Sequence, residues 1–141
     1  MSATEKTKVT VKTTVNAPID KVWKYWTEPE HIQKWNQASA DWHTPKATNN
    51  LMVGGSFSST MAAKDGSMSF DFNGSYTQVD ENKFIAYTIA DGRRVTISFA
   101  KQIEGVEIVE IFEAESMNSV EMQEAGWQAI LDSFKNYTES N

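Results

Sequence analysis

The spacing of hydrophobic residues changes twice near the start of the chain. In KVTVKTTV, residues 8–15, valines recur at alternating positions, whereas Ile19, Val22, Trp23 and Trp26 recur at every third or fourth position. A period of two predicts a half-buried β-strand, and a period near 3.6 predicts an amphipathic helix. Residues 27–35, TEPEHIQKW, restart the helical pattern with a capping-box spacing at their beginning. We therefore predict a strand followed by two short helices, with Pro18 at a first helical position.

The middle of the chain contains a polar segment and then a series of alternating segments. Residues 36–53 contain Pro45 and the turn-prone TNN at 48–50, so we expect an irregular connection with at most a short strand near residues 41–44. Alternation predicts strands over residues 54–63, 68–79, 84–90, 93–100 and 106–115. The connections are short, and Asp91-Gly92 is a strong hairpin signal. These features indicate an antiparallel meander.

The chain closes with a long helical pattern. Asn118 and Glu121 have the capping-box spacing, and the following residues place apolar side chains over about 180° of a helix. Such a wide apolar face needs a large surface to cover, and the predicted sheet provides one. We find no repeats or linkers, and predict one domain over residues 1–141 with an ordered core at about 7–138.

This order of elements resembles the helix-grip fold of the START/SRPBCC superfamily, and the sequence is most similar to AHSA-like proteins, the homologues of the activator of the heat-shock chaperone ATPase. The resemblance rests on NAPIDKVWKYWTEPEHIQKW, ADWHTPKATNNLMVGGSF, IADGRRVTI, IFEAES and QEAGWQAILDSFKNY. It implies an α+β fold in which a curved antiparallel sheet of about six to seven strands wraps around the C-terminal helix. It also implies a cavity between sheet and helix, where members of the superfamily bind sterols, lipids, polyketides or plant hormones. Some members are cyclases or dehydratases, and the eukaryotic activator is a co-chaperone.

Composition narrows the choice of partners. The 141 residues carry a formal net charge of -6 and include no cysteine. An acidic chain without a Lys/Arg cluster is not expected to bind nucleic acid. The first residues contain no apolar signal segment, and no apolar run approaches the roughly 20 residues of a membrane span. We therefore expect a cytoplasmic protein that is not inserted in a membrane.

The resemblance and the strand phases together nominate residues that face the cavity. On the strands these are Phe57, Met61, Phe70, Phe72, Tyr76, Val95, Ile97, Phe99, Ile108 and Phe112, and on the helix Met122, Gln123, Gly126, Trp127 and Ile130. For the apolar ones, plain core packing is the alternative. A glycine inside a helix costs up to about 1 kcal/mol relative to alanine. Gly126 thus indicates either tight packing of the helix on the sheet or room for a ligand.

Glu110 is in phase with Ile108 and Phe112, so it points inward if they do. A buried carboxyl without a partner is costly, and it either keeps its proton or finds a cation. Arg93 is a possible cation at the cavity rim. Glu110 could bind a polar group of a ligand or act as a general acid or base. The alternative is a bulge in this strand, or an inward-facing pair of Val109 and Ile111.

The stretch KWNQASADWHTPK, residues 34–46, gathers Trp35, Asp41, Trp42 and His43. The chain has no cysteine and no G-x-S-x-G motif, so nucleophilic catalysis has little support. We expect Trp35 and Trp42 to wall or close the core. For His43, a structural hydrogen bond, a ligand contact and catalysis all remain open. With only two histidines and no ligand spacing we expect no metal site, and we expect His31 to be solvated.

Three functions follow from these observations. The first is the binding of a hydrophobic or amphipathic small molecule, lipid-, polyketide- or aromatic-like, in the cavity. The second is cyclase or dehydratase chemistry with Glu110 and His43 as the catalytic candidates. The third is a chaperone-associated role, linked to the stress response. No cofactor is expected, and the chain could be a monomer or a dimer.

Overall fold

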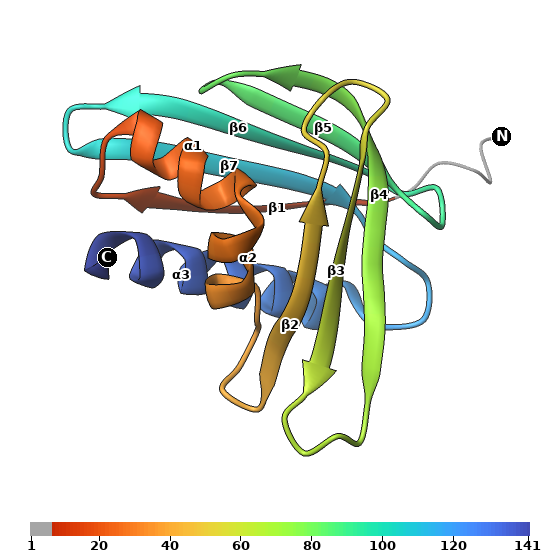
Figure 1. Cartoon of the computed structure of the whole chain (residues 1–141). Helices are drawn as coiled ribbons and strands as arrows, with labels where there is room; N and C mark the ends of the chain where they lie inside the picture. Colours follow the sequence, from red (N-terminus) through yellow and green to blue (C-terminus); the bar gives the residue numbers. More distant parts are fainter. Residues whose placement is uncertain (1–6) are drawn as a thin grey trace, which may run out of the picture.

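The computed structural model of the protein describes residues 7–141 and contains one antiparallel sheet with three helices (Figure 1). The strands are β1 (Lys8–Val15), β2 (Trp42–Asn49), β3 (Ser56–Ala63), β4 (Ser69–Asp80), β5 (Phe84–Ile89), β6 (Arg94–Gln102) and β7 (Gly105–Glu113). The helices are α1 (Ile19–Thr27), α2 (Pro29–Trp35) and α3 (Val120–Ser140). The expectation of loose first residues falls on residues 1–6, outside the described part.

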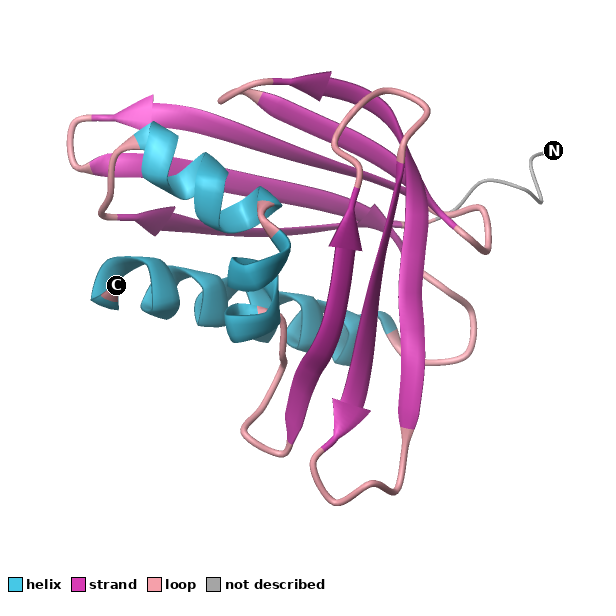
Figure 2. Cartoon of the chain, in the orientation of Figure 1, coloured by secondary structure: helices cyan, strands magenta, loops and turns pink. Residues whose placement is uncertain are grey.

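The seven strands follow the order β1-β7-β6-β5-β4-β3-β2, so the first strand pairs with the last and the others form a meander. The sheet bends strongly, and β2, β3 and β4 turn away from the direction of β1, β7 and β6 (Figure 2). The helix α3 runs alongside β1, and α1 and α2 lie over the concave side (Figure 1). The predicted α+β helix-grip fold is confirmed.

The segment expected to be irregular contains a complete edge strand. β2 extends from Trp42 to Asn49 and includes Pro45, and its pairing with β3 shifts between His43 and Lys46. Proline cannot donate a ladder hydrogen bond, and it is therefore tolerated at sheet edges and bulges. The irregular segment predicted over residues 36–53 was wrong for residues 45–49, where the strand continues beyond the short stretch expected near 41–44, because an edge strand allows Pro45 at this position.

The pairing of β7 settles the direction of Glu110. β7 pairs with β1 and with β6 without a register shift, so it contains no bulge. Val106, Ile108 and Phe112 are fully buried, and Glu110 lies on the same face with 7% exposure. The alternative with Val109 and Ile111 inward is therefore excluded.

Helix starts differ from the capping boxes that we predicted. Thr27 does not cap α2; its Oγ1 donates to the carbonyl of Trp23 within α1 at 2.8 Å, and α2 begins with Pro29. The cap of α3 is Ser119 rather than Asn118, since the Ser119 Oγ accepts the Met122 N–H at 3.1 Å. Pro18 stands one residue before α1. α3 ends at Ser140, two residues beyond the predicted ordered core.

The second half of α3 completes the free edge of β1. The Gln128 side chain donates to the carbonyl of Lys12 at 3.1 Å and accepts its N–H at 3.4 Å. The Lys135 ammonium donates to the carbonyl of Thr14 at 2.6 Å, and a Glu139 oxygen accepts the N–H of Asn16. Side chains of α3 thus satisfy backbone groups that a neighbouring strand would otherwise pair.

Large aromatic side chains fill the space beneath the helices. We call this cluster the closed core: Trp23, Trp26, Trp35, Phe99 and Phe134. The Trp26 ring centre lies 4.8 Å from that of Phe134 and 5.7 Å from that of Phe99, both in edge-to-face contact. Such contacts leave little free volume. In the described part of the chain, none of the helices has the length and apolar character needed to cross a membrane.

Candidate functional site

A cavity of about 340 Å³ lies between the bent part of the sheet and the first half of α3. Strands β2 to β5 and β7, the helices and the 114–119 connection all contribute to its lining. Its volume falls within the range of small-molecule sites, and its lining is mostly apolar with a few polar groups. Among the pockets of the described chain it is therefore the candidate functional site.

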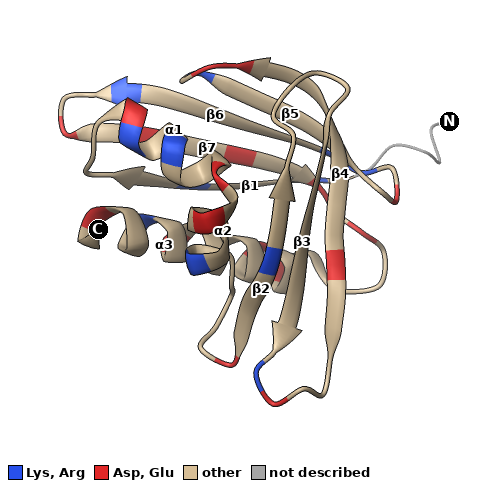
Figure 3. Cartoon of the chain, in the orientation of Figure 1, with Lys and Arg blue, Asp and Glu red and all other residues tan. Residues whose placement is uncertain are grey.

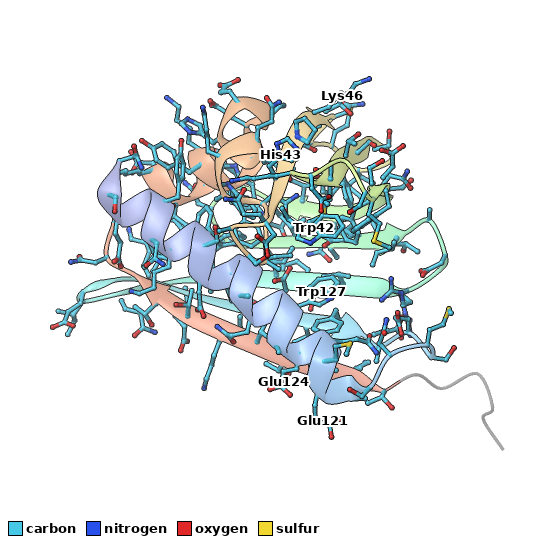
Figure 4. All side chains as sticks on the ribbon, turned by 90° about the horizontal axis from the view of Figure 1, so that it is seen from below. Trp42, His43, Lys46, Glu121, Glu124 and Trp127 are labelled. Carbon is cyan, nitrogen blue, oxygen red and sulfur yellow. The ribbon has the colours of Figure 1, made fainter. Side chains whose placement is uncertain are left out.

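Aromatic rings form one continuous side of the cavity, which we call the cavity wall: Phe57, Phe72, Tyr76, Tyr87 and Trp127. The ring centres of Phe57 and Tyr87 lie 4.7 Å apart, and those of Phe72 and Trp127 lie 6.0 Å apart, both edge-to-face. Strand alternation brings the first four rings to the same face, and α3 brings Trp127 across from them. Figure 4 shows Trp127 on α3, with Glu121 and Glu124 projecting from the start of the helix.

Trp127 is held in place by a second ring. It stacks on Phe112 of β7, with ring centres 4.0 Å apart and planes 9° from parallel. Phe112 is fully buried under this stack, so Trp127 and not Phe112 meets the cavity. The helix thus joins the sheet through this pair at the level of the cavity.

Glu110 is the most unusual group of the lining. Its neighbours in register on the adjoining strands are Val11 and Ile97, so the carboxyl interrupts an apolar row. Within residues 7–141 its side chain makes no hydrogen bond or ion pair. Burial raises the pKa of Glu110 from 4.5 to about 8. The carboxyl therefore holds its proton at neutral pH and can donate or transfer it inside the cavity.

Two tyrosines of the cavity wall have raised pKa values, and Tyr87 is the one near this carboxyl. Burial, followed by the nearby Glu110 carboxyl, raises the pKa of Tyr87 well above its usual value. Burial also raises the pKa of Tyr76, whose hydroxyl donates to Asn49 Oδ1 at 2.5 Å. Both phenols stay neutral, so Tyr87 offers a neutral hydroxyl next to Glu110.

The rim of the cavity is polar. The Arg93 Nε donates to Asp91 at 2.9 Å, and this side chain lines the cavity. Gln123 also lines it, but its amide is bonded within the adjoining segment: Oε1 accepts the Glu115 N–H, and Nε2 donates to the carbonyls of Glu115 and Asn118. Gln123 therefore ties the 114–119 connection to the first turn of α3.

The structure brings many of the predicted cavity residues together. Those that line the cavity are Trp35, Phe57, Met61, Phe70, Phe72, Tyr76, Arg93, Glu110, Gln123, Trp127 and Ile130. Val95, Ile97, Phe99, Ile108 and Phe112 point inward but are covered by other side chains and belong to the buried core. Trp42, His43, Met122 and Gly126 lie outside the lining.

We expected Trp42 to wall or close the core and kept a ligand contact open for His43, but neither side chain lines the cavity. Trp42 pairs with Ala63 on the inner face of the sheet and packs edge-to-face against the lining residue Phe70, with ring centres 6.0 Å apart. His43 pairs with Ala62, which faces away from the inward-pointing Met61, and so lies on the outer face of the sheet. Figure 4 shows both residues on β2, across from α3. Asp41 and His43, both in the described part, make no hydrogen bond with each other, so the geometry gives no support to His43 as a catalytic group.

Met122 and Gly126 also depart from the expected arrangement. Met122 is 63% exposed, because the inward direction of α3 is set by Gln123, Trp127 and Phe134 instead. A Cβ atom added to Gly126 would meet nothing within 4 Å. Tight helix-to-sheet packing therefore does not explain this glycine, and open space adjoins the helix at this position.

Sequence reasoning missed Tyr87 as a lining residue. The signal was present, because Ile85, Tyr87 and Ile89 occupy alternating positions of the predicted strand, and the structure buries all three. Ser59, Ile85 and Trp26 also line the cavity. Trp26 could not be assigned from its helical spacing, since a core residue and a cavity residue have the same period.

His31 and two carboxylates form a small cluster at the start of α2. Ligand atoms of Glu28, Glu30 and His31 lie within 4.8 Å of one another. However, His31 Nδ1 is 2.7 Å from the Tyr137 hydroxyl, and its ring stacks on Tyr25 with centres 4.0 Å apart. His31 is thus half-buried and bonded rather than solvated as expected, and it joins α2 to α3.

Charged side chains outside the cavity are dispersed. Lys and Arg positions are spread over α1, α2, β2, strand ends and connections rather than gathered on one face (Figure 3). Together with the formal net charge of -6, this distribution gives no electropositive surface for a phosphate backbone.

Comparison with known proteins agrees with this architecture. The sequence model of the family described as Activator of Hsp90 ATPase homolog 1-like protein matches residues 16–139. The solution structure of an AHSA1-like protein from Aeromonas hydrophila is 42% identical, covers 95% of this chain and 93% of its own, and superposes with a TM-score of 0.90. A solution structure from Cytophaga hutchinsonii is 58% identical over 96% of this chain and 93% of its own, with a TM-score of 0.79.

More distant structures share the fold alone. A crystal structure from Chromobacterium violaceum is 19% identical, covers 96% of this chain and 99% of its own, and has a TM-score of 0.83. No match was found among the curated proteins.

Proposed function

The chain belongs to the family of Activator of Hsp90 ATPase homolog 1-like proteins, within the START/SRPBCC superfamily, and on that premise we propose that it binds a hydrophobic or amphipathic small molecule in its cavity. The observation that carries the proposal is the cavity itself, about 340 Å³ between α3 and an aromatic wall. The superfamily binds hydrophobic ligands, and the open lining of this chain has the size and apolar character for the same task. We also propose that the protein acts in the cytoplasm.

Two neighbouring serines of β3 give a matched test. Ser59 is buried and lines the cavity, whereas the adjacent Ser58 does not line it and lies on the outer face of the strand. We expect Ser59→Leu to fill part of the cavity and to weaken binding of an apolar fluorescent probe such as 1-anilinonaphthalene at least about tenfold, since overlap with the ligand removes its space. Ser58→Leu should bind as the wild type does.

Native mass spectrometry of the protein purified from its own host provides a second measurement. We expect a retained small molecule in the wild type and a smaller retained fraction in Ser59→Leu. Circular dichroism and thermal unfolding establish that each variant is folded. Equal probe binding by the two serine variants, with both folded, would remove the cavity as the binding site.

A specific observation also favours a second candidate function. Glu110 carries a proton near neutral pH because of its raised pKa, and it lies in an apolar cavity beside Tyr87. Such a carboxyl suits general acid or base catalysis of the cyclase or dehydratase type. If it is catalytic, Glu110→Gln should remove turnover of a bound polyketide-like substrate while binding persists. Unchanged turnover in this variant would exclude the role.

The family description also names activation of a chaperone ATPase. A co-chaperone role for this chain would show as stimulation of the ATPase rate of the host's Hsp90-type chaperone by the purified protein. No stimulation at saturating protein would exclude it.

A further inference from the structure

We propose that the ligand carries a cationic amine that pairs with Glu110 while its apolar body lies against the cavity wall. The inference rests on the proposed binding function and specifies the chemical class of the ligand. The geometry that points to it is a buried carboxyl, without a partner, among aromatic rings in an open cavity.

The surroundings of Glu110 supply no partner for its charge. Val11 and Ile97 flank it on the adjoining strands, and no cation of the described chain lowers its pKa. An ionised carboxylate here is costly unless a cation and hydrogen-bond donors reach it. The Glu110 carboxyl therefore lacks a cationic partner in the described chain, and the cavity leaves space for a cation of the ligand.

Aromatic rings favour the same kind of ligand. The lining includes eight aromatic side chains, and Tyr87 is close enough to Glu110 for the two groups to influence each other electrostatically. Ring faces attract ammonium groups, more strongly when water is excluded. Phe57 and Tyr87 pack edge-to-face, with ring centres 4.7 Å apart, and both rings line the cavity.

Arg93, the one cation among the described lining residues, is already engaged, so the cavity offers little to an anionic ligand. It pairs with Asp91 at 2.9 Å. Glu115, which lines the cavity, has its pKa lowered, first by the backbone N–H of Asn118, and is ionised. An anionic head group would meet these carboxylates, whereas a cation would be attracted by them.

Binding of an ammonium has a proton balance that can be measured. At pH 7 the Glu110 carboxyl is protonated, so forming the ion pair releases one proton from it to the solvent, and no other bond changes. Among the titratable or charged groups that line the cavity, Tyr87 and Tyr76 have raised pKa values and stay neutral, and Arg93 is paired with Asp91. Affinity should therefore increase about tenfold per pH unit up to roughly pH 8, because only the ionised carboxylate pairs with the cation.

The test uses three probes with one apolar body: 2-(1-naphthyl)ethylamine, 2-(1-naphthyl)ethanol and 1-naphthylacetate. Isothermal titration calorimetry at pH 7 gives the affinity of each. Repeating the amine titration in buffers of different ionisation enthalpy gives the number of protons released. We expect the amine to bind at least about tenfold more tightly than the alcohol, with close to one proton released.

Two variants localise the effect. In Glu110→Gln the amine and the alcohol should bind with about equal affinity, and no proton should be released on binding, because the amide cannot ionise. Glu107→Gln makes the same side-chain replacement on the same strand, but Glu107 does not line the cavity. It should keep both the amine advantage and the proton release.

Each outcome is decisive. Equal affinity for amine and alcohol overturns the amine inference and leaves the proposed binding function standing. Tightest binding of the anionic probe overturns it too, and transfers the polar contact to Arg93. Absence of binding by all three probes overturns the proposed function together with the inference. An amine advantage that persists in Glu110→Gln shows that another group holds the cation.

Discussion

The closed core and the cavity wall are built from the same kinds of side chain but differ in what covers them. In the closed core, Trp26 and Trp35 come from α1 and α2 and meet Phe134 of α3 at 4.8 and 5.0 Å. In the cavity wall, the rings stand on strands, and Trp127 is the one ring of the group that comes from a helix. Side chains of α1, α2 and α3 fill the space in the closed core, whereas about 340 Å³ bordered by Trp26 and Trp35 stays unfilled in front of the cavity wall.

The comparison teaches that aromatic content does not distinguish a core from a site. In the closed core the aromatic rings are covered by other side chains, whereas in the cavity wall they border open space. Glu110 marks the boundary, since the apolar row on either side of it belongs to the core and its own carboxyl meets the cavity.

The largest effect tests the two regions directly. Phe134 is fully buried between two tryptophans, so Phe134→Ala leaves a void and should lower the free energy of unfolding by about 3 to 5 kcal/mol. Phe72→Ala only enlarges a cavity that already exists, and should lower it by about 1 to 2 kcal/mol. Urea unfolding of both variants measures the difference, and equal losses would contradict the division into a filled and an open region.

The second effect sharpens the boundary at Glu110. The pKa of this carboxyl is raised in the folded state, so its protonation stabilises the fold fully below pH 4.5, and this stabilisation is lost as pH rises toward about 8. Glu110→Gln lacks this dependence. Its stability relative to the wild type should therefore increase by on the order of 2 to 3 kcal/mol between pH 5 and pH 7. Urea unfolding of both proteins at pH 5 and pH 7 measures this change. If the stability difference between the variant and the wild type were the same at both pH values, Glu110 would not be desolvated.

A smaller effect separates the two halves of α3. Gln128 bonds both backbone groups of Lys12 at the edge of β1. Gln128→Ala should cost about 1 kcal/mol, since these hydrogen bonds are partly exposed to water. Glu124→Ala, on an exposed position over the cavity half, is the matched change and should alter the free energy of unfolding by less than about 0.5 kcal/mol. Similar losses in both variants would mean that the edge contacts contribute nothing.

The smallest effect concerns the open space beside α3. Gly126→Ala meets no atom within 4 Å and improves helix propensity, so it should stabilise the protein by about 0.5 to 1 kcal/mol. Gly74 provides the opposite case, because an added Cβ would lie 2.5 Å from the Thr88 carbonyl oxygen and 3.1 Å from the Phe57 ring. Gly74→Ala should destabilise. Thermal unfolding measures both signs, and a destabilised Gly126→Ala would show that the space is filled.

The order of elements could be predicted from the sequence because periodicity reports which face of each element is covered. β1, β5 and α3 were placed within a few residues in this way. β2 was not, because Pro45 and the polar TNN have the same appearance in a loop and in an edge strand.

The site could be predicted less completely. Counting phase along β7 indicated Glu110, and the structure places it in the cavity lining. Phase cannot show which inward residue is covered by another side chain, and for this reason Phe99 and Phe112 were included. Nor can it fix the inward direction of a helix to within one residue, and in α3 Gln123 is buried while Met122 is exposed.

The uneven attachment of α3 determines which part of the helix opens most readily. Opening residues 128–139 would break the bonds of Gln128, Lys135 and Glu139 and uncover the backbone of β1. Opening residues 120–127 would separate the stacked pair of Trp127 and Phe112, while the Gln123 bonds move with the 114–119 connection. Amide hydrogen exchange should therefore be faster in the first half of α3, and ligand exchange through that half requires no exposure of the sheet edge.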